Sequence, residues 1–473
     1  MINLLFRSFI FSLCFITQII PVGYANDLPA ENPEVIIIGA GMSGLAAAQA
    51  LQQEGIKTLV LEARNRVGGR IHTVQPWGAS TDLGASWMHK STNNPLLKIV
   101  NEYHIPVSYT KYAISHPFDR FESSVVFDEN GKKLDSSTVA STIGQLKKIN
   151  AFVEQDTVPH PTTYSFENAF QDYVKKFPID ADSLQRVKNM SYFVFESDAA
   201  ADKSEVSIAL IKNLKSVTSG HDALFLNGYN ELLSKLTKNV PILLNQVVQK
   251  VQYNGNKVIV TTQENKTYQA KYVIVTLPLG VLQAGTVQFE PKLPQEKQDA
   301  IKNMGMALMN KAYLLFDEPF WDKEKEWLLF FPPKNAPHET FEALNYYNKT
   351  KQPILLFFSV GDFAKELEQR SDQKIIARIM ETLKSAYGNN IPEPTSVLIT
   401  RWGSDPFSRG SYSFPSITAS LTDIQALAKP IANKVFFAGE ATADTDGSMV
   451  QGAYFSGVKA AQLITSQELA HEK

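Results

Sequence analysis

Cysteine is almost absent from this chain of 473 residues, which contains only Cys14. Cys14 lies in an N-terminal stretch that we expect to be removed, so the mature chain would contain no cysteine. This absence excludes disulfides, thiolate metal sites and a cofactor bonded to a cysteine. We predict no metal site, and any prosthetic group should be held without a covalent bond to sulfur.

Net charge is also nearly absent. The chain has 46 basic and 48 acidic residues, a formal charge of -2. Nucleic-acid binding through phosphates needs a basic excess, so we predict no nucleic-acid partner. Repeats and low-complexity tracts are lacking. A chain of this length with 44% hydrophobic residues can bury a large core and indicates two or three domains. The sequence leaves the oligomeric state open.

The first residues have the features of an export signal. Arg7 precedes the apolar stretch Ser8–Ile20, Pro21 ends it, and small residues surround a cleavage point after Ala25. The stretch is short for a membrane-spanning helix, so we predict no stable membrane anchor. Residues 1–25 are therefore predicted to be a signal peptide, and the mature protein to be secreted or periplasmic. An uncleaved anchor is the alternative.

The stretch from Val35 to Glu62 carries the clearest pattern. Val35–Ile38 is a short, β-branched run typical of a buried parallel strand. A glycine-rich turn, Gly39–Gly44, leads into an Ala- and Leu-rich helix, and Thr58–Leu61 forms a second strand that delivers Glu62. Strand, turn, helix, strand and acid in this register predict a dinucleotide-binding unit.

Each glycine of this turn has a separate task. Gly39 makes the tight turn, Gly41 lets a pyrophosphate approach the backbone, and Gly44 lets the helix pack on the strand. The N-terminus of the helix faces the phosphates. Glu62 would accept the ribose hydroxyls and disfavour a 2′-phosphate. The predicted cofactor contacts of this unit are Gly39, Gly41, Met42, Ser43, Gly44, Glu62, Ala63 and Arg64.

The motifs that follow carry a family resemblance. LEARNRVGGR ends at Arg70, and DLGASWMH ends at His89. Together they resemble the flavin-containing amine oxidases, and most closely the polyamine oxidase branch. The resemblance spans Val35 to Gln462. It implies an α/β chain with an FAD-binding Rossmann-like domain of the glutathione-reductase type and a substrate domain of mixed β-sheet and helices. The implied boundaries are 33–90, 220–300 and 420–465 for the first domain, and 91–219 and 301–419 for the second.

The resemblance also implies most of the remaining cofactor contacts. Arg70 would contact the FAD pyrophosphate, Glu440 its ribityl or pyrophosphate region, and Val248 its adenine. Ser411 stands where monoamine oxidases carry the cysteine bonded to FAD, so the FAD here should be non-covalent. The contacts implied in addition to those above are Gly69, Arg70, Gly84, Ala85, Ser86, Trp87, Val248, Trp402, Gly439, Glu440, Met449 and Val450.

Lys311 is the most informative single residue. It lies in Met309–Phe316, a run that is apolar on both faces and so predicts a strand covered on both sides. Lysines are almost never fully buried without a partner. By resemblance, Lys311 would hold a water next to the reactive nitrogen of the flavin. The alternative is a lysine at the start of the strand that points to solvent.

Other candidates rest on the resemblance alone. Tyr412 would lie beside the substrate. His89 matches a histidine near the flavin in animal polyamine oxidases; a hydrogen-bonded structural histidine is the alternative. Lys90 replaces a usual glycine and, as a cation near the pocket, would disfavour long polyamines. Gln451 replaces the histidine of polyamine oxidases and the acid of monoamine oxidases. Glu196 could hold a substrate amine, although a solvated helix acid is the favoured interpretation.

The resemblance therefore implies an FAD-dependent amine oxidase with Lys311, Tyr412 and His89 as catalytic candidates. A neutral, polyamine-like amine would give a hydride from its α-carbon to the flavin, and the imine would be hydrolysed. Oxygen would reoxidise the flavin with release of hydrogen peroxide. Three alternatives stay open. An L-amino acid oxidase should place an arginine at Ser86–Met88. The others are a non-catalytic flavin-binding protein and a nicotinamide dehydrogenase.

Overall fold

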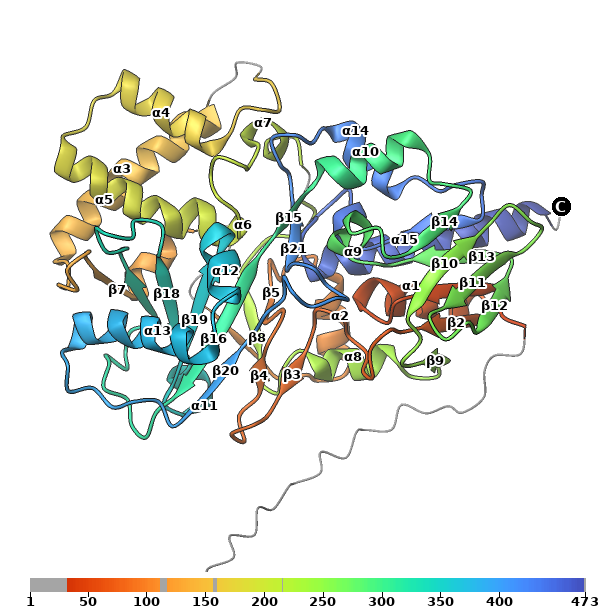
Figure 1. Cartoon of the computed structure of the whole chain (residues 1–473), viewed down its shortest axis with the longest axis horizontal. Coiled ribbons are helices and arrows are strands. Elements are labelled where there is room, and N and C mark those ends of the chain that lie inside the picture. Colours follow the sequence, from red (N-terminus) through yellow and green to blue (C-terminus); the bar gives the residue numbers. More distant parts are fainter. Residues whose placement is uncertain (1–31, 111–116, 156–159, 215, 472–473) are drawn as a thin grey trace, which may run out of the picture.

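The computed structural model describes residues 32–110, 117–155, 160–214 and 216–471 (Figure 1). The predicted signal peptide, residues 1–25, lies outside the described residues. Within them, no helix is both long and apolar enough to cross a membrane. The fold is mixed α/β with several separate sheets, which confirms the predicted class at that level.

A five-stranded sheet contains the N-terminal pattern, and every neighbouring pair in it runs parallel. Helix α1 (Met42–Gln53) connects two of its strands, and α15 (Val450–His471) packs against α1. The two helices approach closely at Gly457, because a Cβ there would lie 2.1 Å from Ser43 O. In spatial order the strands are β22 (Val435–Phe437), β13 (Tyr272–Val275), β1 (Val35–Ile38), β2 (Thr58–Leu61) and β9 (Ile242–Leu243).

Alternate residues of β1 supply two different cores. Val35 and Ile37 pack in the core of α1 and α15, whereas Ile36 and Ile38 pack against a second sheet. Both faces are thus covered, which explains why the strand is continuously apolar. The strands of the second sheet, in spatial order, are β12 (Thr267–Ala270), β11 (Val258–Thr262), β10 (Val248–Gln252) and β14 (Gln288–Glu290).

A six-stranded sheet forms the other half of the molecule (Figure 1). Helices α12 (Gly361–Glu368) and α13 (Asp372–Tyr387) supply a core on one face. Helices α3 (Ser136–Gln155), α4 (Phe166–Lys176) and α5 (Ala181–Ser191) supply a core on the other. In spatial order its strands are β20 (Ser396–Ile399), β16 (Met309–Leu315), β19 (Ile354–Val360), β18 (Phe341–Asn345), β17 (Trp327–Phe330) and β7 (Ser124–Phe127).

Short strands fill the space between the two large sheets. They form three small sheets, which join β3 to β4, β15 to β21, and β5 to β8 and β6. Their bounds are β3 (Thr73–Val74), β4 (Thr81–Asp82), β5 (Trp87–Met88), β6 (Val107–Tyr109), β8 (Ala223–Phe225), β15 (Gly305–Ala307) and β21 (Tyr412–Phe414).

The remaining elements are short, and one of them is a π-helical turn, η2 (Tyr192–Glu196). It continues directly into α6 (Ser197–Ala199). The others are α2 (Pro95–Glu102), η1 (Asp119–Ser123), α7 (Ile208–Ile211), α8 (Asn230–Leu236), α9 (Leu279–Gln283), α10 (Gln295–Asn303), α11 (Tyr347–Thr350), α14 (Leu421–Ala428) and η3 (Glu440–Thr442).

The chain before α7 does not extend that helix, because Val206 bridges to Ser416 and the Ser207 hydroxyl caps the helix by accepting from Leu210 N. Residues 267–275 divide into β12 and β13, which belong to different sheets. Both large sheets are assembled from segments far apart in the sequence. The exact domain boundaries stay a prediction.

Candidate active site

A cavity of about 370 Å³ lies between the two large sheets and gathers nearly all of the predicted site residues. Gly44 and Val248 are the two that do not line it. Since these residues come from segments far apart in the chain, only the fold brings them together. The predicted residues that line the cavity are Gly39, Gly41, Met42, Ser43, Glu62, Ala63, Arg64, Gly69, Arg70, Gly84, Ala85, Ser86, Trp87, His89, Lys311, Trp402, Tyr412, Gly439, Glu440, Met449 and Val450.

The glycine-rich turn leaves backbone exposed to this cavity. Gly39 has a φ of +105°, in the region that favours glycine, and a Cβ there would lie 2.6 Å from Thr276 Oγ1. No atom lies within 4 Å of a Cβ built on Gly41, so the chain is open at that point. No side chain caps α1, which leaves its first-turn amides available to a ligand. Gly44 instead faces the strand, where a Cβ would lie 2.0 Å from Gly39 O.

Glu62 is buried and holds the turn in place. Its carboxylate accepts from Ala40 N at 2.7 Å and from Arg64 N at 2.9 Å. A carboxylate has about four acceptor positions, so capacity for two hydroxyl donors remains. Burial raises the pKa of Glu62, and the two amide donors and two nearby arginines oppose that rise. The geometry is therefore compatible with an acceptor for ribose hydroxyls.

Two arginines support the second glycine turn. Arg70 pairs with Glu440 at 2.8 Å and donates to Ser411 O at 3.0 Å. Sequence reasoning missed Arg66, whose guanidinium donates to the carbonyls of Val67, Gly69 and Ile71. Burial lowers the pKa of Arg66 to about 10. Arg66 therefore stabilises the turn without lining the cavity, whereas the Arg70–Glu440 pair lines it.

Lys311 is buried in β16, so the solvent-facing alternative is wrong. The residue is 5% exposed, and its ammonium donates to Asp82 O at 2.9 Å, Gly84 O at 2.6 Å and Ser86 Oγ at 2.6 Å. A Cβ on Gly84 would lie 1.8 Å from Arg70 O, so only glycine fits there. Desolvation lowers the pKa of Lys311 to about 7, and the carboxylate of Asp82 opposes the shift.

His89 combines features of both interpretations. It lines the cavity, and its Nδ1 lies 2.7 Å from Oδ2 of the fully buried Asp222. Lys90 does not line the cavity. Its ammonium lies 3.0 Å from Ser216 Oγ and 3.9 Å from Asp446 Oδ1, so its charge is compensated outside the pocket. Lys90 therefore places no cation at the cavity wall, and its effect on long polyamines stays a prediction.

Two carboxylates and the guanidinium between them line the cavity and were missed from the sequence. We call Asp198, Glu342 and Arg120 the acidic cluster. Arg120 donates to Glu342 Oε2 at 2.6 Å and to Asp198 Oδ1 at 3.0 Å. Burial raises the pKa of Glu342, and Arg120 opposes that rise. Glu196 instead pairs with Lys203 at 3.1 Å and does not line the cavity. Asp198, in α6 directly after the π-helical turn η2, therefore lines the wall, whereas Glu196, at the end of η2, does not.

Aromatic rings form the wall between Lys311 and the acidic cluster. Trp87 stacks on Trp327 with ring centroids 6.4 Å apart, and Phe358 lies 6.2 Å and 6.0 Å from them. Arg120 lies 4.8 Å from the centre of the Trp327 ring. Tyr412 completes this region by donating to Asp198 O at 3.1 Å, and burial raises the pKa of its phenol. The wall suits a substrate with methylene segments and cationic groups.

Two predicted cofactor residues, Val248 and Arg64, are engaged in contacts with other parts of the protein. Val248 lies in β10 and packs in the core beneath the parallel sheet rather than at the cavity, so its contact with adenine stays a prediction. Arg64 lines the cavity, but its guanidinium is held by Asp405 at 2.7 and 2.9 Å. The Ser411 hydroxyl makes two hydrogen bonds of 2.9 Å with the backbone of Met309, accepting from its N–H and donating to its carbonyl oxygen.

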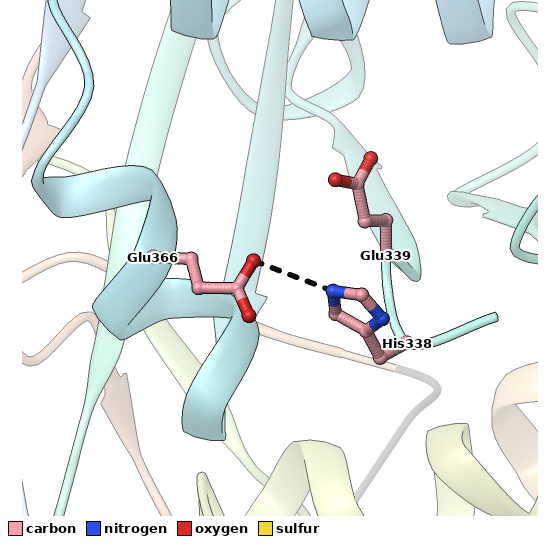
Figure 2. A group of neighbouring side chains, drawn as sticks. All are labelled: His338, Glu339 and Glu366. Carbon is pink, nitrogen blue, oxygen red and sulfur yellow. Dashed lines mark hydrogen bonds and ion pairs between the residues drawn. The ribbon is translucent and has the colours of Figure 1, made fainter. Parts of the chain in front are cut away.

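One group of possible metal-ligating side chains occurs among the described residues, away from the cavity: His338, Glu339 and Glu366 (Figure 2). His338 Nε2 lies 3.3 Å from Glu366 Oε2. Glu339 is already bound by Arg370 at 3.2 Å and by Arg378. Two arginines beside the carboxylate disfavour a cation there, and we assign no metal to this group.

The cavity fits an FAD molecule on several independent observations. It offers open glycine backbone at the uncapped N-terminus of α1, a carboxylate with spare acceptor positions, and the Arg70–Glu440 pair. Trp87 Nε1 is a buried donor without a hydrogen-bond partner among the described residues, which is expected of a wall that meets a ligand.

Comparisons with known proteins agree with this geometry. The family model described as flavin containing amine oxidoreductase matches residues 42–465. The chain is 35% identical to Polyamine oxidase 4 of Oryza sativa subsp. japonica, covering 91% of this chain and 88% of that one. It is 34% identical to Probable polyamine oxidase 4 of Arabidopsis thaliana, covering 94% and 90%. It is also 30% identical to Lysine-specific histone demethylase 1 homolog 1 of Oryza sativa subsp. japonica, covering 91% and 52%.

A match over most of the chain excludes the nicotinamide dehydrogenase alternative, because members of this family use FAD. The enzymatic relatives likewise speak against a non-catalytic flavin-binding protein. The chain therefore belongs to the flavin containing amine oxidoreductase family and is an FAD-dependent amine oxidase.

Proposed function

We propose that the protein oxidises a primary or secondary amine that carries a second cationic group, as polyamines do, and reduces oxygen to hydrogen peroxide. The observation that carries this proposal is the acidic cluster. It brings two carboxylates and one guanidinium to the cavity wall, so its formal charge is negative when both carboxylates are ionised. The aromatic rings beside it can accommodate methylene groups and a cation.

The same cluster disfavours the L-amino acid oxidase alternative. Such an enzyme needs an arginine that is available to a substrate carboxylate. Ser86–Met88 offers none, and Arg120 is already bound to Glu342 and Asp198. An added carboxylate would have to displace one of them at considerable cost, because the pair is buried. We expect amino acids to be poor substrates.

We propose that the parallel sheet with α1 and α15 forms a Rossmann-like FAD-binding domain. Bound FAD supplies the hydride acceptor for amine oxidation and the means of oxygen reduction. The protein supplies binding and orientation: the turn at Gly39–Gly44 and Glu62 hold the dinucleotide, and the aromatic wall excludes water. Lys311 places a buried donor group beside Ser86, and Tyr412 is fixed by Asp198 O as a neutral hydroxyl.

Replacing Asp198 with asparagine tests the substrate class. We expect kcat/KM for spermidine to fall about 10- to 100-fold, since a hydrogen bond to a charged group contributes about 1.5–3 kcal/mol. Dibutylamine, a secondary amine without a second cationic group, should change by less than about threefold. The anchor of Tyr412 is the backbone oxygen of Asp198, so it survives the change.

Glu196→Gln is the matched control, because Glu196 is a nearby acid paired with Lys203 outside the cavity wall. It should leave the ratio of kcat/KM for spermidine to kcat/KM for dibutylamine unchanged. Peroxide-coupled steady-state assays measure kcat/KM for both amines in the unaltered protein and in the Asp198→Asn and Glu196→Gln variants. Equal losses for spermidine and dibutylamine in the Asp198 variant would contradict the proposed substrate class.

FAD should be released intact when the protein is denatured with acid or heat. The mature chain would hold no cysteine. By the resemblance to monoamine oxidases, Ser411 stands where those enzymes carry the cysteine bonded to FAD. Its hydroxyl is bound to the backbone of Met309. Absorbance of the supernatant and of the precipitated chain measures the outcome. Yellow colour that stays with the washed, denatured chain would show that the link is covalent.

Export is proposed from the N-terminal residues. Arg7, the apolar stretch Ser8–Ile20 and Ala25 predict a mature protein that begins at Asn26 outside the cytoplasm. N-terminal sequencing of protein from the native host measures this directly. A chain that begins at Met1 there would refute cleavage.

A further inference from the structure

The carboxylate that holds the His89 ring, Asp222, lies behind the cavity wall and was not identified from the sequence as part of the site. Asp222 is fully buried and does not line the cavity. Its Oδ2 lies 2.7 Å from His89 Nδ1, and its Oδ1 accepts from Lys90 N at 2.9 Å. A carboxylate accepts only, so Nδ1 carries a proton, and in the neutral ring Nε2 then has the lone pair.

The backbone of His89 is fixed as firmly as its ring. Its carbonyl oxygen accepts from Asn94 Nδ2 at 2.8 Å and from Gln451 Nε2 at 3.3 Å. The ring stacks on Trp87, with centroids 6.3 Å apart and an interplanar angle of 20°. Within the described chain, no residue bonds to Nε2, although His89 lines the cavity. Gln451, a departure from the family pattern, therefore contributes to the placement of this histidine through its side chain.

We propose that Asp222 is a positioning residue that makes His89 the acceptor of the proton carried by the substrate ammonium. The proposal rests on the proposed function, because the substrate must be an amine that arrives protonated. The N–H bond of the ammonium breaks, its electron pair stays on the amine nitrogen, and the proton bonds to Nε2. The Asp222 carboxylate stabilises the imidazolium, which later returns the proton to solvent.

The charged surroundings of His89 support this assignment. Asp222 faces its Nδ1, and the Lys90 ammonium is directed to Ser216 and Asp446 instead of the imidazole. Lys311 lines the same cavity but donates to three protein acceptors. A deprotonated His89 is thus a suitable acceptor, and the neutral amine it leaves can release a hydride from its α-carbon.

Asp222→Asn tests the proposal with almost no change of shape. The side-chain oxygen of the new amide would still accept from Lys90 N. Its NH₂ group would then face His89 Nδ1 as a donor, which forces the imidazole proton onto Nε2. We expect kcat/KM for spermidine at pH 7 to fall about 100-fold, as for the loss of a general base. The loss should shrink as the pH approaches about 10, where the free amine needs no acceptor. His89→Gln should behave alike, and the double variant should lose no more.

Nitrogen-15 NMR of histidine-labelled protein reads the tautomer without turnover, with His89→Gln used to assign the signal. The unaltered protein should show the proton on Nδ1, and Asp222→Asn should move it to Nε2. An unaltered protein that turns over no amine would overturn the proposed function alone, because the tautomer would still test Asp222. An unchanged tautomer, a loss that does not vary with pH, or a further loss in the double variant would overturn the role of Asp222.

Discussion

Replacing Lys311 with methionine should slow amine oxidation by roughly 100- to 1,000-fold and leave the FAD content near that of the unaltered protein. A positioned polar group in a dry site contributes roughly 3–4 kcal/mol to the rate. All three N–H donors of Lys311 are used by protein acceptors, so a water held by Lys311 must replace Ser86 Oγ, the acceptor that can rotate away. Stopped-flow absorbance measures reduction by amine and reoxidation by oxygen separately.

Lys297→Met is the matched control. Lys297 is a second buried lysine, 2% exposed, whose pKa burial also lowers to about 7. It donates to Leu427 O at 2.7 Å and does not line the cavity. Its loss should leave both half-reactions unchanged. If Lys311→Met binds FAD and both half-reactions run at the unaltered rates, Lys311 has no catalytic role.

The free energy of unfolding distinguishes a catalytic role of Lys311 from a role in stabilising the fold. Because the pKa of Lys311 falls from 10.5 to about 7 on folding, the unfolded chain binds more protons between these values. Stability therefore rises with pH through that window, and Lys311 weakens the folded state most at pH 7 and below. Methionine removes this penalty but also loses three hydrogen bonds of about 1 kcal/mol each. We expect a change in unfolding free energy of less than about 2 kcal/mol.

The sequence predicts the parts of the site that local constraints specify. The turn at Gly39–Gly44 needs glycine for its backbone geometry, and that need is visible in the spacing alone. Lys311 is conspicuous because a charge interrupts a strand that is apolar on both faces. The same reasoning, applied to Phe341–Asn345, would have singled out Glu342, a charge in a strand with every residue buried.

The rest of the site depends on contacts between distant segments. Arg120 lies in a 3₁₀ turn and meets Glu342, 222 residues later in the chain. Asp222 meets His89 across 133 residues. No period or local motif specifies such pairs. Lys90 shows the converse error, because its neighbourhood in sequence suggests a pocket residue whereas the fold directs its charge to Ser216 and Asp446.

Replacing Arg120 with methionine should destabilise the folded protein by about 3–5 kcal/mol, the usual cost of leaving one partner of a buried ion pair without the other. Glu342 is 2% exposed and, among the residues that the structure describes, would keep only the Ser197 hydroxyl as a donor. Equilibrium unfolding in urea, followed by circular dichroism, measures the loss. Glu342→Gln combined with Arg120→Met should recover much of it, because the amide removes the buried charge and still accepts from Ser197.

The loss should also depend on pH in a defined direction. Burial raises the pKa of Glu342, and removing Arg120 removes the main opposing effect, so the carboxyl of the variant titrates well above 4.5. Above pH 4.5 the folded variant then binds a proton that the unfolded chain has released, and its stability falls as the pH rises through that range. Arg120→Met should therefore be closer to the unaltered protein at pH 5 than at pH 8. An equal loss at both values, or no recovery in the double variant, would show that Arg120 stabilises the fold through its packing on Trp327 and not through its charge.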